Sequence, residues 1–312
     1  MSVIEVQSPG LFTTVQDLGR NGFGPIGVSA SGAADPIALR LGNLLVGNPE
    51  GAAALEFTLL GGTFRFPDGA VLALTGSDFG ATIDGQPIEP WIIAEAAAGA
   101  TLRLGHTRSG ARCYLCIRGG IAVSLFLGSA STHVLSGLGG LEGRPLRKGD
   151  VLPVGRQPFT RPKQRLLPDA LSRLAPRKVL RATEGPQYDW FPESCRRQFF
   201  GNVYRVGQES NRVGLRLQGT PLDASTSGRM ITEGVALGSI QIPQGGQPVI
   251  LFVEQQTTGG YPKIASVISA DLASIGQLRP GDDIRFERVS MREARDLVRE
   301  QEALIAAKEI LQ

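Results

Sequence analysis

Residues 255–263, Gln-Gln-Thr-Thr-Gly-Gly-Tyr-Pro-Lys, carry the highest concentration of groups in the chain that could perform chemistry. They form a tight connection between two apolar runs, 249–253 and 264–268, which have the composition of buried strands. Glycines at such a connection let backbone amides approach a ligand closely, because they have no Cβ. A hairpin would also need the two glycines, but it would not need the hydroxyls and the lysine beside them. We therefore predict a ligand-binding loop here.

Five other loops combine hydroxyl, amide or arginine side chains with small or turn-forming residues. They are residues 13–20, 31–35, 118–120, 210–216 and 241–243. For any one loop, turn formation and helix capping are the default explanation of these residue types. Arginines beside glycines can also bind a carboxylate or a phosphate through paired hydrogen bonds. Together the loops predict a pocket for a small polar molecule, acting by hydrogen bonding and electrostatic stabilisation.

Residues typical of metal, nucleotide and nucleophile sites are scarce. The chain has only two histidines, His106 and His133, so a histidine-rich metal site is excluded and we predict no metal. Residues 22–27 match the glycine spacing of a dinucleotide motif, but a loop follows them where that motif needs a helix. Cys113 and Cys116 lie in a predicted strand, where residues three apart point to opposite faces. We interpret both cysteines as buried apolar residues.

Composition narrows the class of protein. With 312 residues the chain is long enough for two structural units, and its 41 glycines with few amphipathic helical runs indicate a mainly β structure. A formal charge of +3, without a basic stripe interleaved with aromatic residues, argues against nucleic-acid binding. We find no apolar run long enough to span a membrane and no signal peptide, so we expect a cytoplasmic protein.

Two pairs of similar segments, in the same order, indicate an internal duplication. Residues 62–69 match 238–245, and residues 146–151 match 278–283. Each half therefore has an alternating strand that ends at Pro-x-Gly and a later Gly-Asp turn before another strand. We predict two β-barrel-like halves joined by a basic, proline-containing segment.

Few helices are expected. Asp35 before Pro36 is typical of a helix start, and Gly47 is suited to its end. Ser290 and Glu293 fit a capping box at the start of a C-terminal helix. The predicted divisions are an N-terminal half at 1–157, a linker at 158–178, a C-terminal half at 179–290 and a terminal helix at 291–312.

Four motifs in matching order resemble a single family. They are Thr-Thr-Val-Gln-Asp at 13–17, Leu-Leu-Val-Gly-Asn at 44–48, Gly-Gly-Leu-Glu-Gly-Arg at 139–144 and Gln-Thr-Thr-Gly-Gly-Tyr-Pro at 256–262. The family is that of the C subunit of bacterial 5-oxoprolinase, formerly grouped as allophanate hydrolase subunit 2. It includes the antagonist of a sporulation kinase inhibitor and the biotin-dependent carboxyltransferase-like part of urea carboxylase. The resemblance extends over about residues 3–289.

The resemblance implies two cyclophilin-like β-barrel halves and an enzyme subunit that is active only in a complex. Its partners would be the B subunit of the enzyme, similar to the kinase inhibitor and joined in a heterodimer or heterotetramer, and the A subunit. The implied reaction is the opening of 5-oxo-L-proline to L-glutamate, with ATP used by the assembled complex. Two alternatives stay open: a biotin-dependent carboxyltransferase acting on a urea-like amide, and a non-enzymatic partner of the B-subunit homologue. In neither case is biotin expected on this chain, because no lysine has the methionine neighbours of an attachment site.

The loops and the resemblance together assign the site. We predict catalytic roles for Glu254, Thr257, Thr258 and Tyr261. The predicted substrate-binding residues are Gln16, Asp17, Arg20, Arg118, Arg212, Arg216, Gln241, Gly259, Gly260 and Lys263. The chain departs from the family pattern at Glu254, where aspartate is usual. That change keeps the carboxylate but moves it outward by one methylene, so its role as acid, base or orienting group stays open.

Overall fold

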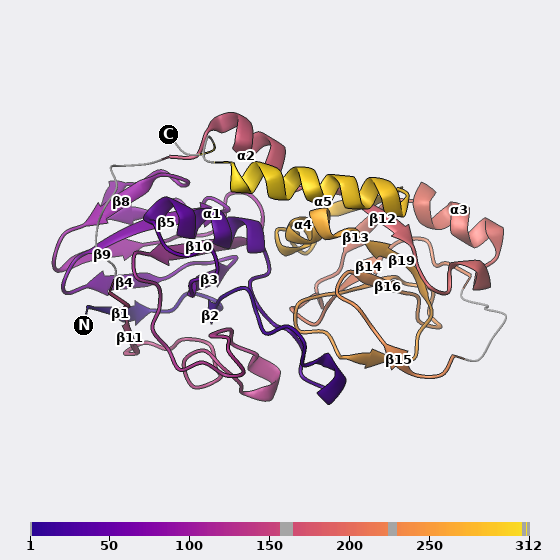
Figure 1. The fold of residues 1–312 in the computed structure, drawn as a ribbon, viewed down its shortest axis with the longest axis horizontal. Helices are drawn as coiled ribbons and strands as arrows, with labels where there is room; N and C mark the ends of the chain where they lie inside the picture. The colour runs from indigo at the N-terminus through magenta and orange to yellow at the C-terminus, as the bar shows by residue number, and fades with distance from the viewer. Residues whose placement is uncertain (1, 157–164, 224–229, 308–309, 311–312) are drawn as a thin grey trace. The chain divides into compact units, whose positions relative to one another are not determined.

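The computed structural model describes residues 2–156, 165–223, 230–307 and 310 (Figure 1). The chain divides into two compact units. Unit 1 contains Met1–Arg20, Ser31–Leu174 and Ala307–Gln312, and unit 2 contains Asn21–Ala30 and Ala175–Ala306. Both are built mainly of β-strands, as predicted, and short helices accompany them. Among the described residues, no helix combines the length and the apolar character needed to cross a membrane.

The strands of unit 1 form two antiparallel sheets. The first has the order β11 (Val151–Pro153), β1 (Val3–Ser8), β4 (Thr63–Phe66), β9 (Ala100–Arg103), β6 (Thr82–Ile83) and β7 (Gln86–Pro87). The second has the order β2 (Thr13–Gln16), β3 (Ala54–Thr58), β10 (Arg112–Ile117), β5 (Ala70–Gly76) and β8 (Ile93–Ala96). The helical segments of this unit are α1 (Pro36–Val46), η2 (Val134–Ser136) and α2 (Pro168–Leu174).

The core of unit 1 forms because alternate residues of its strands are apolar and face inward. Phe64 of β4 and Phe57 of β3 meet edge to face, with ring centroids 5.3 Å apart. Strand β10 is buried on both faces: Cys113 lies in this core, whereas the Cys116 thiol lies near the Leu39 carbonyl of α1. Burial raises the pKa of Cys116 to about 12. The prediction of two buried, divergent cysteines is confirmed.

Unit 2 is a closed barrel with a small additional sheet. The barrel strands, in order, are β12 (Val179–Glu184), β19 (Lys263–Val267), β16 (Ser239–Gln241), β17 (Val249–Leu251), β14 (Gly214–Gln218), β13 (Tyr204–Val206) and β20 (Asp283–Arg288). The parallel pairing of β12 with β20 closes it. The additional sheet consists of β15 (Glu233–Gly234) and β18 (Thr258–Gly259). The helical segments are η1 (Gly24–Ile26), η3 (Tyr188–Trp190), α3 (Glu193–Gly201), η4 (Ser269–Asp271), α4 (Leu272–Gly276) and α5 (Met291–Ala306).

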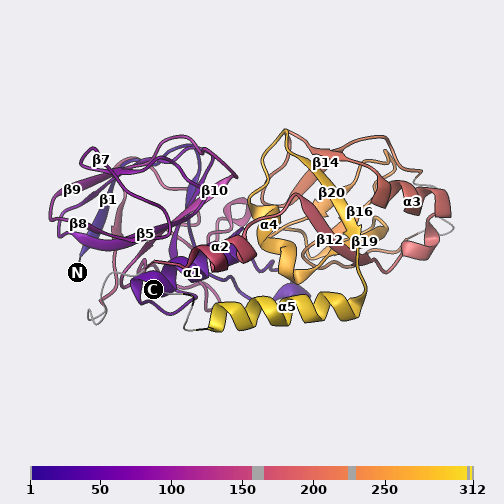
Figure 2. The same cartoon turned by 90° about the horizontal axis from the view of Figure 1, so that it is seen from above.

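The predicted caps at Asp35, Gly47, Ser290 and Glu293 are confirmed, whereas the C-terminal helix, predicted over 291–312, ends at Ala306. The Asp35 carboxylate accepts a hydrogen bond of 3.0 Å from the Ala38 amide at the start of α1, and Gly47 ends that helix with a φ of 79°. At the start of α5, the Glu293 amide donates to the Ser290 hydroxyl and the Ser290 amide donates to the Glu293 carboxylate. Figure 2 shows α5 on the outer side of unit 2, where its apolar face packs against residues 268–270.

The internal duplication is visible in one repeated turn. In unit 1, the Val6 amide donates to the Asp150 carbonyl at 2.9 Å and the Val6 carbonyl accepts from the Gly149 amide at 2.8 Å. In unit 2, Val206 makes the same two bonds, of 2.9 and 2.8 Å, with the Gly-Asp pair at 281–282. The predicted linker, 158–178, contains α2, and its residues 158–164 lie outside the described residues.

Candidate functional site in unit 2

The segment 255–263 is a crossing connection and not the tight connection that the sequence suggested. Strands β17 and β19 do not pair with each other, because β16 lies between them and pairs with both. The chain must therefore pass over the end of β16 between residues 252 and 262. On the way it forms β18, which pairs with β15. Neither Gly259 nor Gly260 has a positive φ, so the hairpin explanation of the two glycines is wrong.

Gly259 packs closely against a glutamine. A Cβ added at Gly259 would lie only 2.6 Å from Nε2 of Gln241 and 3.1 Å from a methyl group of Val235. A Cβ at Gly260 would meet nothing closer than the Thr232 hydroxyl at 3.5 Å, which is an ordinary contact. Gln241 is buried, and its amide donates to the Tyr261 carbonyl at 3.5 Å. Of the two glycines, only Gly259 is closely packed, so that a side chain there would displace the end of Gln241.

Lys263 lies at the centre of a polar cluster beside this glutamine. It is the register partner of Gln241 on the neighbouring strand, and its ammonium group makes an ion pair with Glu233. The Gln187 side chain joins both groups: its Nε2 donates to Glu233 Oε1 at 2.9 Å, and its Oε1 accepts from the Lys263 backbone amide at 3.1 Å. We call Gln187, Glu233, Gln241, Gly259 and Lys263 the lysine cluster.

Two members of the lysine cluster, Gln187 and Glu233, were not predicted from the sequence. They lie 76 and 30 residues before Lys263 in the chain, in segments without a motif. Hydrogen bonds from Lys263 and then from Gln187 lower the pKa of Glu233 below its usual 4.5. Glu233 is therefore a stable anion at neutral pH, and the cluster joins one buried cation to one carboxylate at the surface.

The predicted hydroxyl groups lie next to the lysine cluster and reach solvent. Thr258 is exposed, Thr257 is partly buried and Tyr261 is 49% exposed. The Thr257 carbonyl accepts a 3.1 Å hydrogen bond from the Val235 amide, which holds the backbone of the segment against residues 233–235. Residues 255–263, together with strands β16 and β19, thus carry hydrogen-bonding groups of three kinds: hydroxyl, amide and ammonium.

Arg212 and Glu254 bind each other. The Arg212 Nε donates to Glu254 Oε1 at 2.5 Å, and the Glu254 backbone amide donates to the Arg212 carbonyl at 2.8 Å. Their side chains are 6% and 3% exposed. A carboxylate held in this way orders the loop that carries it, and this geometry favours a positioning role over proton transfer. Arg216, in contrast, is exposed and lies 3.6 Å from Glu209.

In unit 1, the predicted residues Gln16, Asp17 and Arg20 are engaged by the loop at 129–132. The Asp17 carboxylate accepts four hydrogen bonds, from the hydroxyls of Ser129 and Ser131 and from the amides of residues 19 and 130. The Gln16 side chain donates to Thr14 and to the Thr132 carbonyl. Arg20 donates to the Ser131 carbonyl and lies over the Phe126 ring. All three are buried, and their contacts join β2 to this loop.

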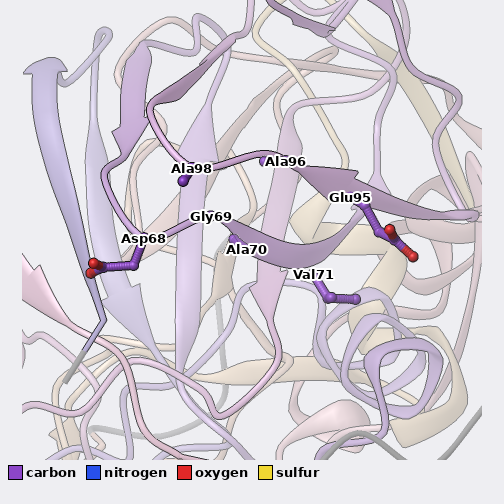
Figure 3. Close-up of a pocket in the computed structure, with 7 residues that line it drawn as sticks. All are labelled: Asp68, Gly69, Ala70, Val71, Glu95, Ala96 and Ala98. Atoms are coloured by element: carbon purple, nitrogen blue, oxygen red, sulfur yellow. The ribbon is translucent and has the colours of Figure 1, made fainter.

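Arg118 belongs to a different part of unit 1. Its Nε donates to the Val46 carbonyl at 3.0 Å, and burial lowers the pKa of the guanidinium. With Arg156 it lines a hollow of about 390 Å³. A neighbouring hollow of about 360 Å³ shares residues 69–71 with it, and Figure 3 shows the Asp68 and Glu95 carboxylates at its two ends. The charges of the two hollows are therefore opposite, and neither contains a residue of the lysine cluster.

The chain resembles proteins whose activities are known. The family of the carboxyltransferase domain, subdomain A and B, matches residues 26–288. The chain is 38% identical to the C subunit of 5-oxoprolinase from Escherichia coli, over 94% of this chain and 93% of that protein. It is 36% identical to the C subunit of the Haemophilus influenzae enzyme, over 97% of this chain and 95% of that protein. These relationships confirm the predicted family.

Larger proteins contain a region similar to the whole chain. The Saccharomyces cerevisiae urea amidolyase is 36% identical over 97% of this chain, which corresponds to 18% of that protein. The crystal structure of the K. lactis urea amidolyase superimposes with a TM-score of 0.90 at 33% identity, over 99% of this chain and 21% of the other. The fold described above is thus also that of about one fifth of the K. lactis urea amidolyase chain.

Proposed function

The chain belongs to the carboxyltransferase domain family, and from this membership we propose that it is the C subunit of an ATP-dependent 5-oxoprolinase. With the A and B subunits it would open 5-oxo-L-proline to L-glutamate. The observation that carries this proposal is coverage: the chain matches 93–95% of the length of two bacterial C subunits, but only 18% of a urea amidolyase. Because the identity to these two C subunits is 36–38% over nearly their whole length, we propose the same role for this chain.

The chemistry of the reaction fits the groups around the lysine cluster. In the ring opening the lactam C–N bond breaks, the hydroxyl of water joins the carbonyl carbon and the nitrogen takes up a proton. An amide resists this attack, so the enzyme must bind its oxygen and nitrogen and stabilise the charge that develops. Thr257, Thr258 and Tyr261 supply hydroxyls for the amide, and Lys263 adds a positive charge that attracts an anionic substrate. Glu254, bound to Arg212, would hold the neighbouring loop in place.

ATP would enter the reaction through the assembled complex. The chain has no P-loop sequence, which is the usual glycine-rich cradle for the phosphates of ATP. We therefore assign to this chain the binding of the amide substrate and not the primary binding of the nucleotide. A protein with this role has no expected turnover when it is alone.

Reconstitution tests the proposal. The purified chain, mixed with the A and B subunits, should produce glutamate and ADP from 5-oxoproline and ATP. Replacing Thr257 and Thr258 by alanine should reduce turnover about 100-fold, because each lost hydroxyl removes a transition-state hydrogen bond. Thr220→Ala, at an exposed threonine of the same unit, is the matched control and should keep full turnover. Absence of turnover from a correctly assembled wild-type complex would exclude this function.

A second candidate is carboxyl transfer from biotin to a urea-like amide. The structural similarity to the K. lactis urea amidolyase, with a TM-score of 0.90, supports it. Both reactions act on an unreactive amide, so the same hydroxyls and lysine would serve. Carboxybiotin added in trans should then be consumed only when an amide acceptor is present. Two outcomes would count against this candidate: consumption of carboxybiotin when no acceptor is present, and no consumption of carboxybiotin when the acceptor is present.

A third candidate is a non-enzymatic partner of the B-subunit homologue. Large apolar side chains reach solvent near the lysine cluster, with Ile231 86% and Tyr261 49% exposed, and such residues are common at interfaces. The double threonine variant separates this candidate from the first. A binding module should keep both its partner and its effect on that partner, whereas a catalytic component should keep its partner and lose turnover.

A further inference from the structure

Lys263 is a buried cation whose ion-pair partner lies at the protein surface. Its side chain is 3% exposed, whereas the side chain of Glu233, its ion-pair partner, is 45% exposed. A buried ammonium group without an anion beside it is strongly unfavourable. Some anion must therefore occupy the position next to Lys263, and in this structure the Glu233 carboxylate occupies it.

Glu233 is attached to the rest of unit 2 by few interactions. Strand β15, on which it lies, has two residues and pairs with the two residues of β18. The flanking residues 231, 232 and 234 are exposed. Among the described residues, two groups donate hydrogen bonds to the Glu233 carboxylate: the Lys263 ammonium and the Gln187 side-chain amide. This carboxylate can therefore leave into water at small cost, provided that another anion replaces it.

We propose that Lys263 recognises the carboxylate of the substrate, and that Glu233 occupies that carboxylate's position in the free protein. This inference rests on the proposed function, because 5-oxoproline carries one carboxylate beside its lactam amide. The incoming carboxylate would take over the bonds from Lys263 and from Gln187 Nε2. Gln241, the register partner of Lys263, and the hydroxyl of Thr258 would then be left for the lactam.

The two arginines predicted to bind anions are less suited to this role. Arg212 is bound to Glu254, and both side chains are buried, so displacing Glu254 would leave a buried carboxylate without its cation. Arg216 is 61% exposed beside an exposed Glu209, where water screens its charge. Lys263 alone among these cations is buried and has a partner that can move into solvent.

Two substrates that differ by one charge provide the kinetic test. The assembled complex is assayed with 5-oxoproline and with its neutral carboxamide. Lys263→Met should raise KM for 5-oxoproline by about 10- to 100-fold, the range for a hydrogen bond to a charged group, and should abolish the preference for the acid over the carboxamide. Glu233→Gln should lower KM for 5-oxoproline, because the internal competitor loses its charge. Lys178→Met, which removes an exposed cation of unit 2, is the control and should leave the preference unchanged.

Acetate binding to the isolated full chain gives a second, independent measurement. By calorimetry, acetate should bind more tightly to Glu233→Gln than to the wild type and should not bind to Lys263→Met. A wild-type complex that turns over 5-oxoproline, with Lys263→Met keeping its preference for the acid, would overturn the inference and leave the proposed function standing. A wild-type complex without turnover, combined with the expected acetate pattern, would exclude the function and retain Lys263 as a carboxylate site.

Discussion

Asp17 in unit 1 and Glu233 in unit 2 are carboxylates that use the same chemistry in opposite ways. Asp17 is buried and accepts four hydrogen bonds from hydroxyls and amides of its own unit. Glu233 is half exposed and receives its bonds from one lysine and one glutamine. The first carboxylate joins parts of the fold and has no reason to exchange its partners. The second can exchange them with water or a ligand.

The difference shows what separates a binding loop from a structural one. Residues 13–20 in unit 1 and residues 255–263 in unit 2 both contain hydroxyls, amides and glycines. From composition alone, both segments are candidates for a ligand site. In unit 1 the Asp17 carboxylate is satisfied by residues 129–131 and by the amide of residue 19, whereas the buried Oε1 of the neighbouring Gln16 accepts no hydrogen bond from the described residues. In unit 2 the hydroxyl of Thr258 and the carboxylate of Glu233 remain accessible. The burial and internal pairing of the carboxylate, and not the number of polar groups, therefore distinguish the two segments.

The largest effect expected from this comparison is on the stability of unit 1. Asp17→Asn would remove the negative charge and replace one acceptor oxygen by an NH₂ group. That group would face hydroxyl or amide donors that it cannot bond, so the free energy of unfolding should fall by about 3 kcal/mol. Urea denaturation measures this change. Asp84→Asn is the control, because the Asp84 carboxylate accepts from the Thr101 amide at an exposed position and its replacement should cost less than about 1 kcal/mol. Equal stability of the two variants would show that the Asp17 contacts are not structural.

The next effect concerns Gly259. Alanine there would place a Cβ against Gln241, and overpacking of this kind costs about 1–3 kcal/mol. The loss should appear in thermal unfolding and should be largely recovered in the double variant with Gln241→Ala. Gly260→Ala, one residue along, has room for its methyl group and should change stability by less than about 0.5 kcal/mol. If both alanines cost the same, the close approach of Gly259 to Gln241 is not the cause.

Thr258 should show the reverse of the behaviour of Asp17. Because its side chain is exposed, Thr258→Ala should change the free energy of unfolding by no more than about 0.5 kcal/mol while reducing turnover of the assembled complex about 10-fold. Parallel denaturation and turnover measurements decide this. A stability loss comparable to that of Asp17→Asn would remove the distinction between the two loops.

The smallest expected effect is on the pH dependence of stability. The pKa of Glu233 is lowered in the folded protein, so its ion pair stabilises fully above the unfolded value near 4.5 and is lost as the pH falls through the lower folded value. Below pH 4.5, wild-type stability should therefore decline more steeply than that of Glu233→Gln. The half-exposed position of Glu233 keeps the difference small. Identical slopes would indicate that the pair does not form in solution.

Features that depend on neighbouring residues were predicted correctly. The N-cap at Asp35 and the capping box of Ser290 and Glu293 join groups three residues apart, so the local sequence specifies them. The divergent faces of Cys113 and Cys116 follow from the period of a strand. The repeated Gly-Asp turns were visible because each half kept the same short pattern. The family motifs, which extend along the chain, led to the fold in the same way.

The tertiary structure alone decided how the site is assembled. Strand β16 lies between β17 and β19, and this order changes residues 255–263 from a predicted tight connection into a crossing segment. Gln187 and Glu233 reach Lys263 from 76 and 30 residues away, and no local pattern connects them. The sequence by itself determined which elements form, because capping and periodicity act over a few residues. Which polar groups meet, and which stay open to solvent, depends on strand order, and strand order is set by contacts between residues far apart in the chain.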